Sequence, residues 1–125
     1  MENHTFTIWG RSFELEIRYD IRPGETLLPI QKEAAEQLIK KADILDHSLP
    51  ELKKYCAENS DGIVEVQDID NIFKYVVPAY VFVVRDEEHR TVALICYYKF
   101  DPEHGLAMLF ENEELKEIGE EDIAF

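Results

Sequence analysis

The densest group of chemically competent side chains lies in the segment Asp101-Pro102-Glu103-His104-Gly105. Two carboxylates and an imidazole could ligate a transition metal, or supply the acid and the base of a hydrolytic reaction. A metal would need further ligands, which His4, His47 and His89 could provide only if the fold brings them close. The pattern therefore defines a candidate enzyme site built on Asp101, Glu103 and His104.

The same segment is also explained by a purely structural hairpin turn with no catalytic or binding role. Aspartate before proline favours a tight turn, and Gly105 supplies the positive φ angle that a hairpin loop of four or five residues requires. In a third interpretation, the exposed acidic turn is a recognition edge that docks a basic partner with the help of Tyr97, Tyr98 and Phe100. The sequence alone leaves the three interpretations open.

Acidic side chains gather near the C-terminal end. The chain has 27 Asp and Glu against 13 Lys and Arg, a formal net charge of −14 at pH 7. Residues 101–125 hold nine of the acids and one base, Lys116, so a fifth of the chain carries more than half of the excess. The region is either a solvated edge or a landing surface for a basic protein. Its candidate binding residues are Asp101, Glu103, His104, Glu117, Glu120 and Glu121.

The composition and the motifs exclude several classes of function. A general nucleic-acid binder needs clustered Lys and Arg to neutralise phosphates, which this acidic chain does not offer. The sequence has no glycine-rich phosphate loop, G-x-S-x-G elbow, H-E-x-x-H helix or C-x-x-C pair. Asp68-Ile69-Asp70-Asn71 begins like a calcium loop, but Ile72 stands where an oxygen ligand is needed. We therefore expect no catalytic residue, no metal and no cofactor.

The cysteines and the N-terminal residues favour a cytoplasmic protein. Cys56 and Cys96 lie among apolar residues and are expected to be buried free thiols. Met1-Glu2-Asn3-His4 has neither the basic nor the apolar region of a secretory signal, and no apolar run is long enough to cross a bilayer. We expect no association with membranes.

The hydrophobic periodicity predicts the elements that must position these side chains. Alternating apolar and polar residues over 5–20 predict a hairpin, and strands are expected at 79–85, 91–100, 106–110 and 115–118. Apolar residues at three- and four-residue spacing predict a helix over 29–42, and a capping box from Ser48 to Glu51 predicts a second over 49–59. The chain is thus predicted to be one α+β domain over 1–125, an antiparallel sheet of about five or six strands with two main helices packed on one face.

The C-terminal third also resembles a group of small uncharacterised bacterial proteins, a domain of unknown function with a W-D-P-E-H-G core and a C-terminal G-x-x-D-I/V segment. The resemblance covers residues 72–125 and rests on the strand and turn from Leu94 to Ala107 and on Gly119-Glu120-Glu121-Asp122-Ile123. Phe100 stands where the group has Trp, and Tyr98 where Cys is common. The resemblance implies that Asp101, Glu103 and His104 are the polar members of the motif, and that Gly105 and Gly119 are its turn glycines.

Some proteins of that group are suspected immunity proteins, which neutralise toxins passed between bacteria. The leading hypothesis is therefore a non-enzymatic cytoplasmic protein that captures a basic protein, such as a toxin, through its acidic surface. One alternative is a metal-dependent or hydrolytic enzyme that uses Asp101, Glu103 and His104. Another is a housekeeping domain that self-associates through a sheet edge to form a homo-oligomer.

Overall fold

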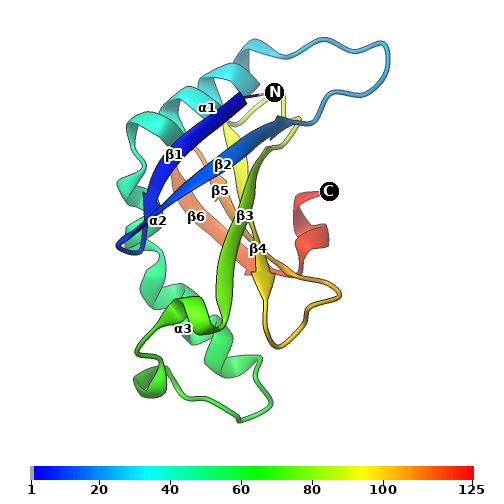
Figure 1. Ribbon diagram of the computed structural model, residues 1–125. Coiled ribbons are helices and arrows are strands. Elements are labelled where there is room, and N and C mark those ends of the chain that lie inside the picture. Colours follow the sequence, from blue (N-terminus) through cyan, green and yellow to red (C-terminus); the bar gives the residue numbers. More distant parts are fainter. Residues whose placement is uncertain (1) are drawn as a thin grey trace.

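The computed structural model describes residues 2–125, which form one six-stranded sheet flanked by helices (Figure 1). The strands are β1 (Glu2–Ile8), β2 (Arg11–Tyr19), β3 (Val76–Val83), β4 (Thr91–Tyr98), β5 (Leu106–Glu111) and β6 (Glu114–Gly119). The α-helices are α1 (Pro29–Lys40), α2 (Asp43–His47) and α3 (Leu49–Glu58). Three short 3-10 helices complete the elements: η1 (Val66–Asp68), η2 (Ile72–Lys74) and η3 (Glu121–Ala124). The α+β class and the number of strands agree with the sequence-based expectation.

The sheet is mixed, so the expectation of a purely antiparallel sheet was wrong. Its strands lie in chain order and pair antiparallel with each neighbour, except that Ile17–Tyr19 of β2 pair parallel to Val81–Val83 of β3. The connection is the cause, because the chain leaves β2, passes through the three α-helices and enters β3 from the opposite end of the sheet. Such a long crossover joins parallel neighbours, whereas the short turns elsewhere join antiparallel ones.

The three α-helices cover one face of the sheet. α1 buries Ala34, Ala35 and Leu38 on the stripe that its period predicts, and α3 buries Leu52 and Cys56. These side chains pack on the strand residues that point to the same side, and together they form the main core. The two main helices were expected close to these bounds, whereas the short α2 between them was not. None of the helices within residues 2–125 is long and apolar enough to cross a bilayer.

The expected capping box at Ser48 is not formed. α2 continues almost directly into α3, so the backbone of Ser48 is itself helical, with φ −82° and ψ −8°. An N-cap needs an extended backbone to aim its side chain at the first free N–H groups. The Ser48 hydroxyl instead donates a hydrogen bond to the carbonyl of Leu45. The motif therefore marks a junction between two helices and not the free start of one.

The second face of the sheet is covered in part by the C-terminal residues. A smaller apolar cluster contains Ala93, Ile95 and Ala107 of the sheet and Ala124 of η3. The last residue also packs here, since the ring of Phe125 lies 4.7 Å from that of Phe82, between centroids. η3 thus shields only part of this face, and the candidate site lies beside it.

Candidate functional site

The turn that follows β4 is closed by Asp101. Its Oδ1 accepts a hydrogen bond of 3.2 Å from the backbone N–H of His104, and its two carboxylate oxygens lie 3.0 and 3.1 Å from His104 Nδ1. The Gly105 N–H donates to the Asp101 carbonyl at 2.9 Å, with φ +62° at the glycine. Asp101 and His104 therefore stabilise the turn itself, as an aspartate bonded to its own following backbone commonly does.

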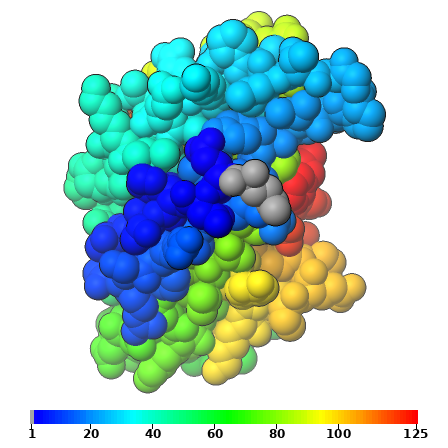
Figure 2. Space-filling model, turned by 45° about the horizontal axis from the view of Figure 1, so that its top comes forward, coloured from blue at the N-terminus to red at the C-terminus, as the bar shows by residue number. Residues whose placement is uncertain are grey.

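The C-terminal segment docks onto this turn and brings Glu121 with it. The Glu121 N–H donates to the His104 carbonyl at 3.0 Å, and the Tyr80 hydroxyl donates to Glu121 Oε1 at 3.4 Å. A methyl group added at Gly105 would lie 3.2 Å from Glu121 Oε2 and 3.1 Å from the Cys96 carbonyl oxygen. Gly105 is thus needed for its backbone angle and also for the close approach of Glu121. Figure 2 shows the turn projecting in orange beside the C-terminal segment in red.

The predicted polar residues are only partly brought together. Ligand atoms of Asp101, His104 and Glu120 lie within 4.8 Å of one another, the one such group within residues 2–125, and Glu103 is not a member. Hydrogen bonding to Asp101 and the negative charges around it raise the pKa of His104. Glu117 lies apart on β6, where it pairs in register with Leu109. The three side chains could act as metal ligands, but the carboxylate of Asp101 is already engaged in the hydrogen bonds that close the turn.

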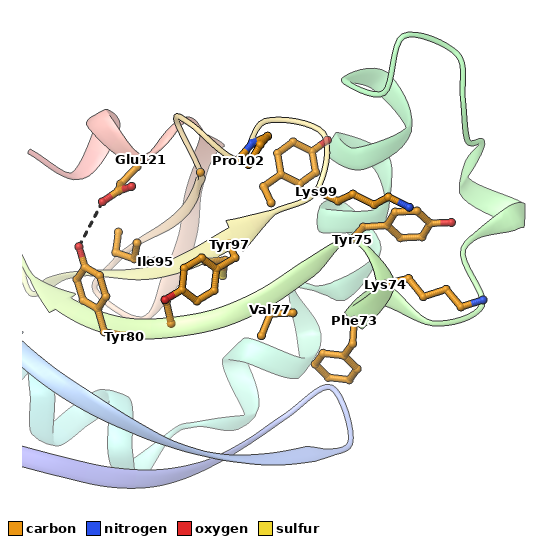
Figure 3. Close-up of a pocket in the computed structure, with 14 residues that line it drawn as sticks. Phe73, Lys74, Tyr75, Val77, Tyr80, Ile95, Tyr97, Lys99, Pro102 and Glu121 are labelled. Carbon is orange, nitrogen blue, oxygen red and sulfur yellow. Dashed lines mark hydrogen bonds between the residues drawn. The ribbon is translucent and has the colours of Figure 1, made fainter.

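A groove of about 440 Å³ opens beside the turn, on the sheet face that the α-helices leave free (Figure 3). Its floor and walls include Val77 and Tyr80 of β3 and Ile95 and Tyr97 of β4. Tyr97 is 70% exposed and Val77 38%, so the groove presents a contiguous aromatic and aliphatic surface to solvent. The charged residues that line the groove are Lys74 and Lys99 at one end and Glu121 near Tyr80 at the other.

The sequence had drawn attention to Tyr97, Gly105 and Glu121 of this groove, but not to Val77, Tyr80 and Ile95. Tyr97 faces the groove, whereas Tyr98 points to the opposite side of the sheet, is 3% exposed and packs against Tyr55 of α3. Tyr80 was missed because a β-bulge between Pro78 and Tyr80 shifts the register of β3 against β4. A bulge re-aims the side chains that follow it, and simple alternation does not reveal it.

The two cysteines are buried free thiols, as expected. Burial raises the pKa of the Cys56 thiol to about 11, and it raises the pKa of Cys96 as well. The reactive form of cysteine is the thiolate, and a raised pKa disfavours it. Both residues therefore act as core side chains in this structure.

Comparisons with known proteins place the chain at the level of its family. No curated protein and no solved structure matches it. A family described as "Domain of unknown function (DUF6985)" matches residues 2–125, which is nearly the whole chain and includes the hairpin and the helices as well as the acidic turn. The chain belongs to this family of domains of unknown function, DUF6985.

Proposed function

We propose that this protein is a non-enzymatic cytoplasmic binding protein that captures a basic protein through the acidic surface around the Asp101–Gly105 turn. We call this surface the acidic rim; its members at the turn are Asp101, Glu103, Glu120, Glu121 and Asp122, and we include Glu117 of β6 as an outlying member because it lies apart from the others. A toxin-neutralising immunity protein is the specific form of the proposal, and it rests on the resemblance of the C-terminal third to suspected immunity proteins.

The observation that carries the proposal is the lack of cationic partners in the rim. Within residues 2–125, its carboxylates form no ion pair with Lys or Arg, and Asp101 pairs only with His104. By contrast, Arg90 holds Glu113 at 2.8 Å, and Lys41 lies 3.8 Å from it. An unpaired group of like charges beside an exposed apolar groove attracts an oppositely charged surface, and the groove can then exclude water from the contact.

Association kinetics test the electrostatic part. The partner is first captured from the source lysate on immobilised protein, with washes at about 50 mM and about 500 mM salt. Binding of the purified partner is then followed by stopped flow for the triple variant Glu117→Lys, Glu120→Lys, Glu121→Lys. We expect the association rate constant to fall by about one to two orders of magnitude at low salt, because steering by complementary charge is lost.

A matched control carries the same change in net charge elsewhere. Glu14, Glu36 and Asp43 are exposed and lie on β2, α1 and α2, away from the rim. Both triple variants are measured at the same low and physiological salt concentrations; at each of them we expect reversal of these three to change the association rate constant by less than about threefold. Equal effects of the two triple variants, or no effect of either, would contradict the proposal. Self-association, measured by sedimentation at several protein concentrations, would point instead to a homo-oligomer.

A second candidate function rests on the cluster of Asp101, His104 and Glu120, whose ligand atoms lie within 4.8 Å. A metal-dependent hydrolase would use these side chains together with a metal-bound water. Elemental analysis of untagged protein and thermal melting with added Zn²⁺ separate the two candidates. About one equivalent of metal with a raised melting temperature would favour the enzyme, whereas below about 0.1 equivalent with no shift would remove it.

A further inference from the structure

Glu121 occupies a built position at one end of the apolar groove. Its backbone is fixed by the His104 carbonyl, one carboxylate oxygen accepts from Tyr80, and the other lies above Gly105, which has no side chain to displace it. Oε2 accepts no hydrogen bond from residues 2–125 in the structure. Figure 3 shows Glu121, Tyr80, Ile95 and Tyr97 around the same end of the groove. The carboxylate is therefore held in place with one oxygen available to a donor.

The surfaces beside this carboxylate are apolar and aromatic. Ile95 is 2% exposed and forms part of the floor, whereas Tyr97 is largely exposed and forms a wall. Such surfaces suit a ligand with a hydrocarbon stem and a cationic head, since the stem can lie on Ile95 and Tyr97 while the head reaches Glu121. A carboxylate with a free oxygen and an adjacent aromatic face is a setting in which guanidinium binds better than ammonium.

The chain itself already places a guanidinium on this aromatic surface. Arg18 of β2 stacks on Tyr80, with its Cζ 3.9 Å from the ring centroid, and Glu16 pairs with it. Because Glu16 pairs with Arg18, the positive charge of the stacked arginine is partly offset within the chain. Glu121 is then the carboxylate among the groove-lining residues that remains for an incoming cation.

We propose that this end of the groove is a receptor for an arginine side chain of the partner protein, with Glu121 as the residue that selects the guanidinium. The proposal rests on the proposed function, because it names the part of the basic partner that enters the groove. The arginine stem lies on Ile95 and Tyr97, and the guanidinium donates to Glu121. The acidic rim attracts the partner, and the groove fixes its position.

Titration of the ¹⁵N-labelled full chain with N-acetyl-L-arginine methylamide tests this receptor by NMR. At constant ionic strength and up to about 50 mM probe, we expect saturable shifts at the amides of Ile95, Tyr97, Gly105 and Glu121, with a Kd on the order of millimolar. The citrulline analogue has the same shape without the charge and should bind at least about fivefold more weakly. Glu121→Gln should weaken arginine binding by a similar factor, whereas Glu117→Gln, which removes a rim charge outside the groove, should change it by less than about twofold.

Several results would overturn the proposal. Equal binding of arginine and citrulline, or of N-acetyl-L-leucine methylamide, would make the groove a general apolar site. Shifts scattered over the acidic rim and absent from Ile95 and Tyr97 would mean counterion binding alone. Shifts of the groove amides with protein concentration and no probe would assign the groove to a second copy of the chain. The electrostatic attraction of the basic partner is decided separately, because the double variant Glu117→Lys, Glu120→Lys leaves Glu121 and the groove in place and should still slow association at low salt.

Discussion

Two turns of this protein have nearly the same sequence and different surroundings. Asp86-Glu-Glu-His89 precedes β4, and Asp101-Pro-Glu-His104 follows it. In both, the aspartate accepts from the histidine N–H three residues later and lies beside its Nδ1, at 3.2 Å in the first turn and 3.0 Å in the second. The local geometry of an Asp-x-x-His turn is therefore common to both ends of the strand.

The neighbours of the two turns differ. Asp86 also accepts from Glu88 N–H and from the Thr91 hydroxyl, and Arg90 next to it binds both carboxylate oxygens of Glu113. Although burial acts to raise the pKa of Asp86, its hydrogen bonds outweigh this and lower the pKa. Asp101, Glu120 and Glu121 form no ion pair with Lys or Arg within residues 2–125, and Glu121 lines the open groove. The two turns share a motif and differ in their surroundings. Beside Asp86 the carboxylate of Glu113 is paired within the protein, whereas around Asp101 carboxylates remain without Lys or Arg partners within residues 2–125.

The largest effect should come from the glycine that ends the second turn. Gly105→Ala places a side chain at φ +62° and within 3.1 Å of the Cys96 carbonyl oxygen, so we expect a loss of about 2–4 kcal/mol in the free energy of unfolding. Gly62→Ala is the control, because Gly62 has φ +79° but nothing within 4 Å of the added methyl, and it should cost only about 1 kcal/mol. Urea unfolding measures both, and equal losses would show that close packing against Glu121 contributes nothing.

Replacing the two aspartates should separate the turns more finely. Asp86→Ala removes four hydrogen-bonding contacts from a half-buried carboxylate and should cost about 1–2 kcal/mol, whereas Asp101→Ala should cost about 1 kcal/mol or less. Since the folded pKa of Asp86 is lowered, its contribution is present above the unfolded value of about 3.9 and is lost as pH falls through the folded value. The difference between Asp86→Asn and wild type in urea unfolding should therefore shrink below about pH 4. A larger loss for Asp101 than for Asp86 would reverse the comparison.

The sequence predicted the elements better than the site. Helical periodicity placed α1 and α3, each of which buries one face, and nearly continuous apolar runs placed β4 and β5, which are buried on both faces of the sheet. It could not show that the helices carry the chain across the sheet before β3, since strand direction depends on connections that local patterns do not encode. Ser48 shows that local patterns can also mislead at short range. Its sequence is that of a helix N-cap, but α2 directly precedes it and holds its backbone in a helical conformation.

The groove depends on contacts between distant residues. Tyr80 and Glu121 are 41 residues apart and meet because the C-terminal segment folds back over the turn after β4. Composition drew attention to the acids of residues 101–125 but could not show which of them are paired: Glu113 pairs with Arg90 and Lys41 from other parts of the chain, whereas Glu121 forms no ion pair within residues 2–125. Charge content can be read from a sequence, whereas charge compensation requires the fold.

The smallest predicted effect is a pH dependence of cation binding that arises from the histidine of the second turn and not from that of the first. Asp101, Glu120 and Glu103 raise the pKa of His104 above its usual value of about 6.5, and His104 lies with Glu120, Glu121 and Asp122 around a small recess beside the groove. With a raised folded pKa, protonated His104 stabilises the fold below about pH 6.5, and this contribution is lost as pH rises through the folded value. The affinity of Glu121 for a cation should depend on pH in the opposite direction. The protonated imidazole of His104 repels the cation, so binding weakens at low pH and strengthens as His104 loses its proton.

Binding of N-acetyl-L-arginine methylamide should therefore strengthen by about twofold between about pH 6 and pH 8, as expected for one charge at a distance of roughly 8 Å in a watery site. His104→Gln should flatten this dependence. His89→Gln makes the same change in the other turn, where the imidazole lies between Asp86 and Glu111, and should leave the dependence intact. Because both variants replace a histidine at the same place in the same turn type, a flat profile for His104→Gln alone would locate the cation beside the second turn. If His89→Gln removed the pH dependence of binding and His104→Gln did not, the cation would bind near the first turn, and the proposed position at Glu121 would be wrong.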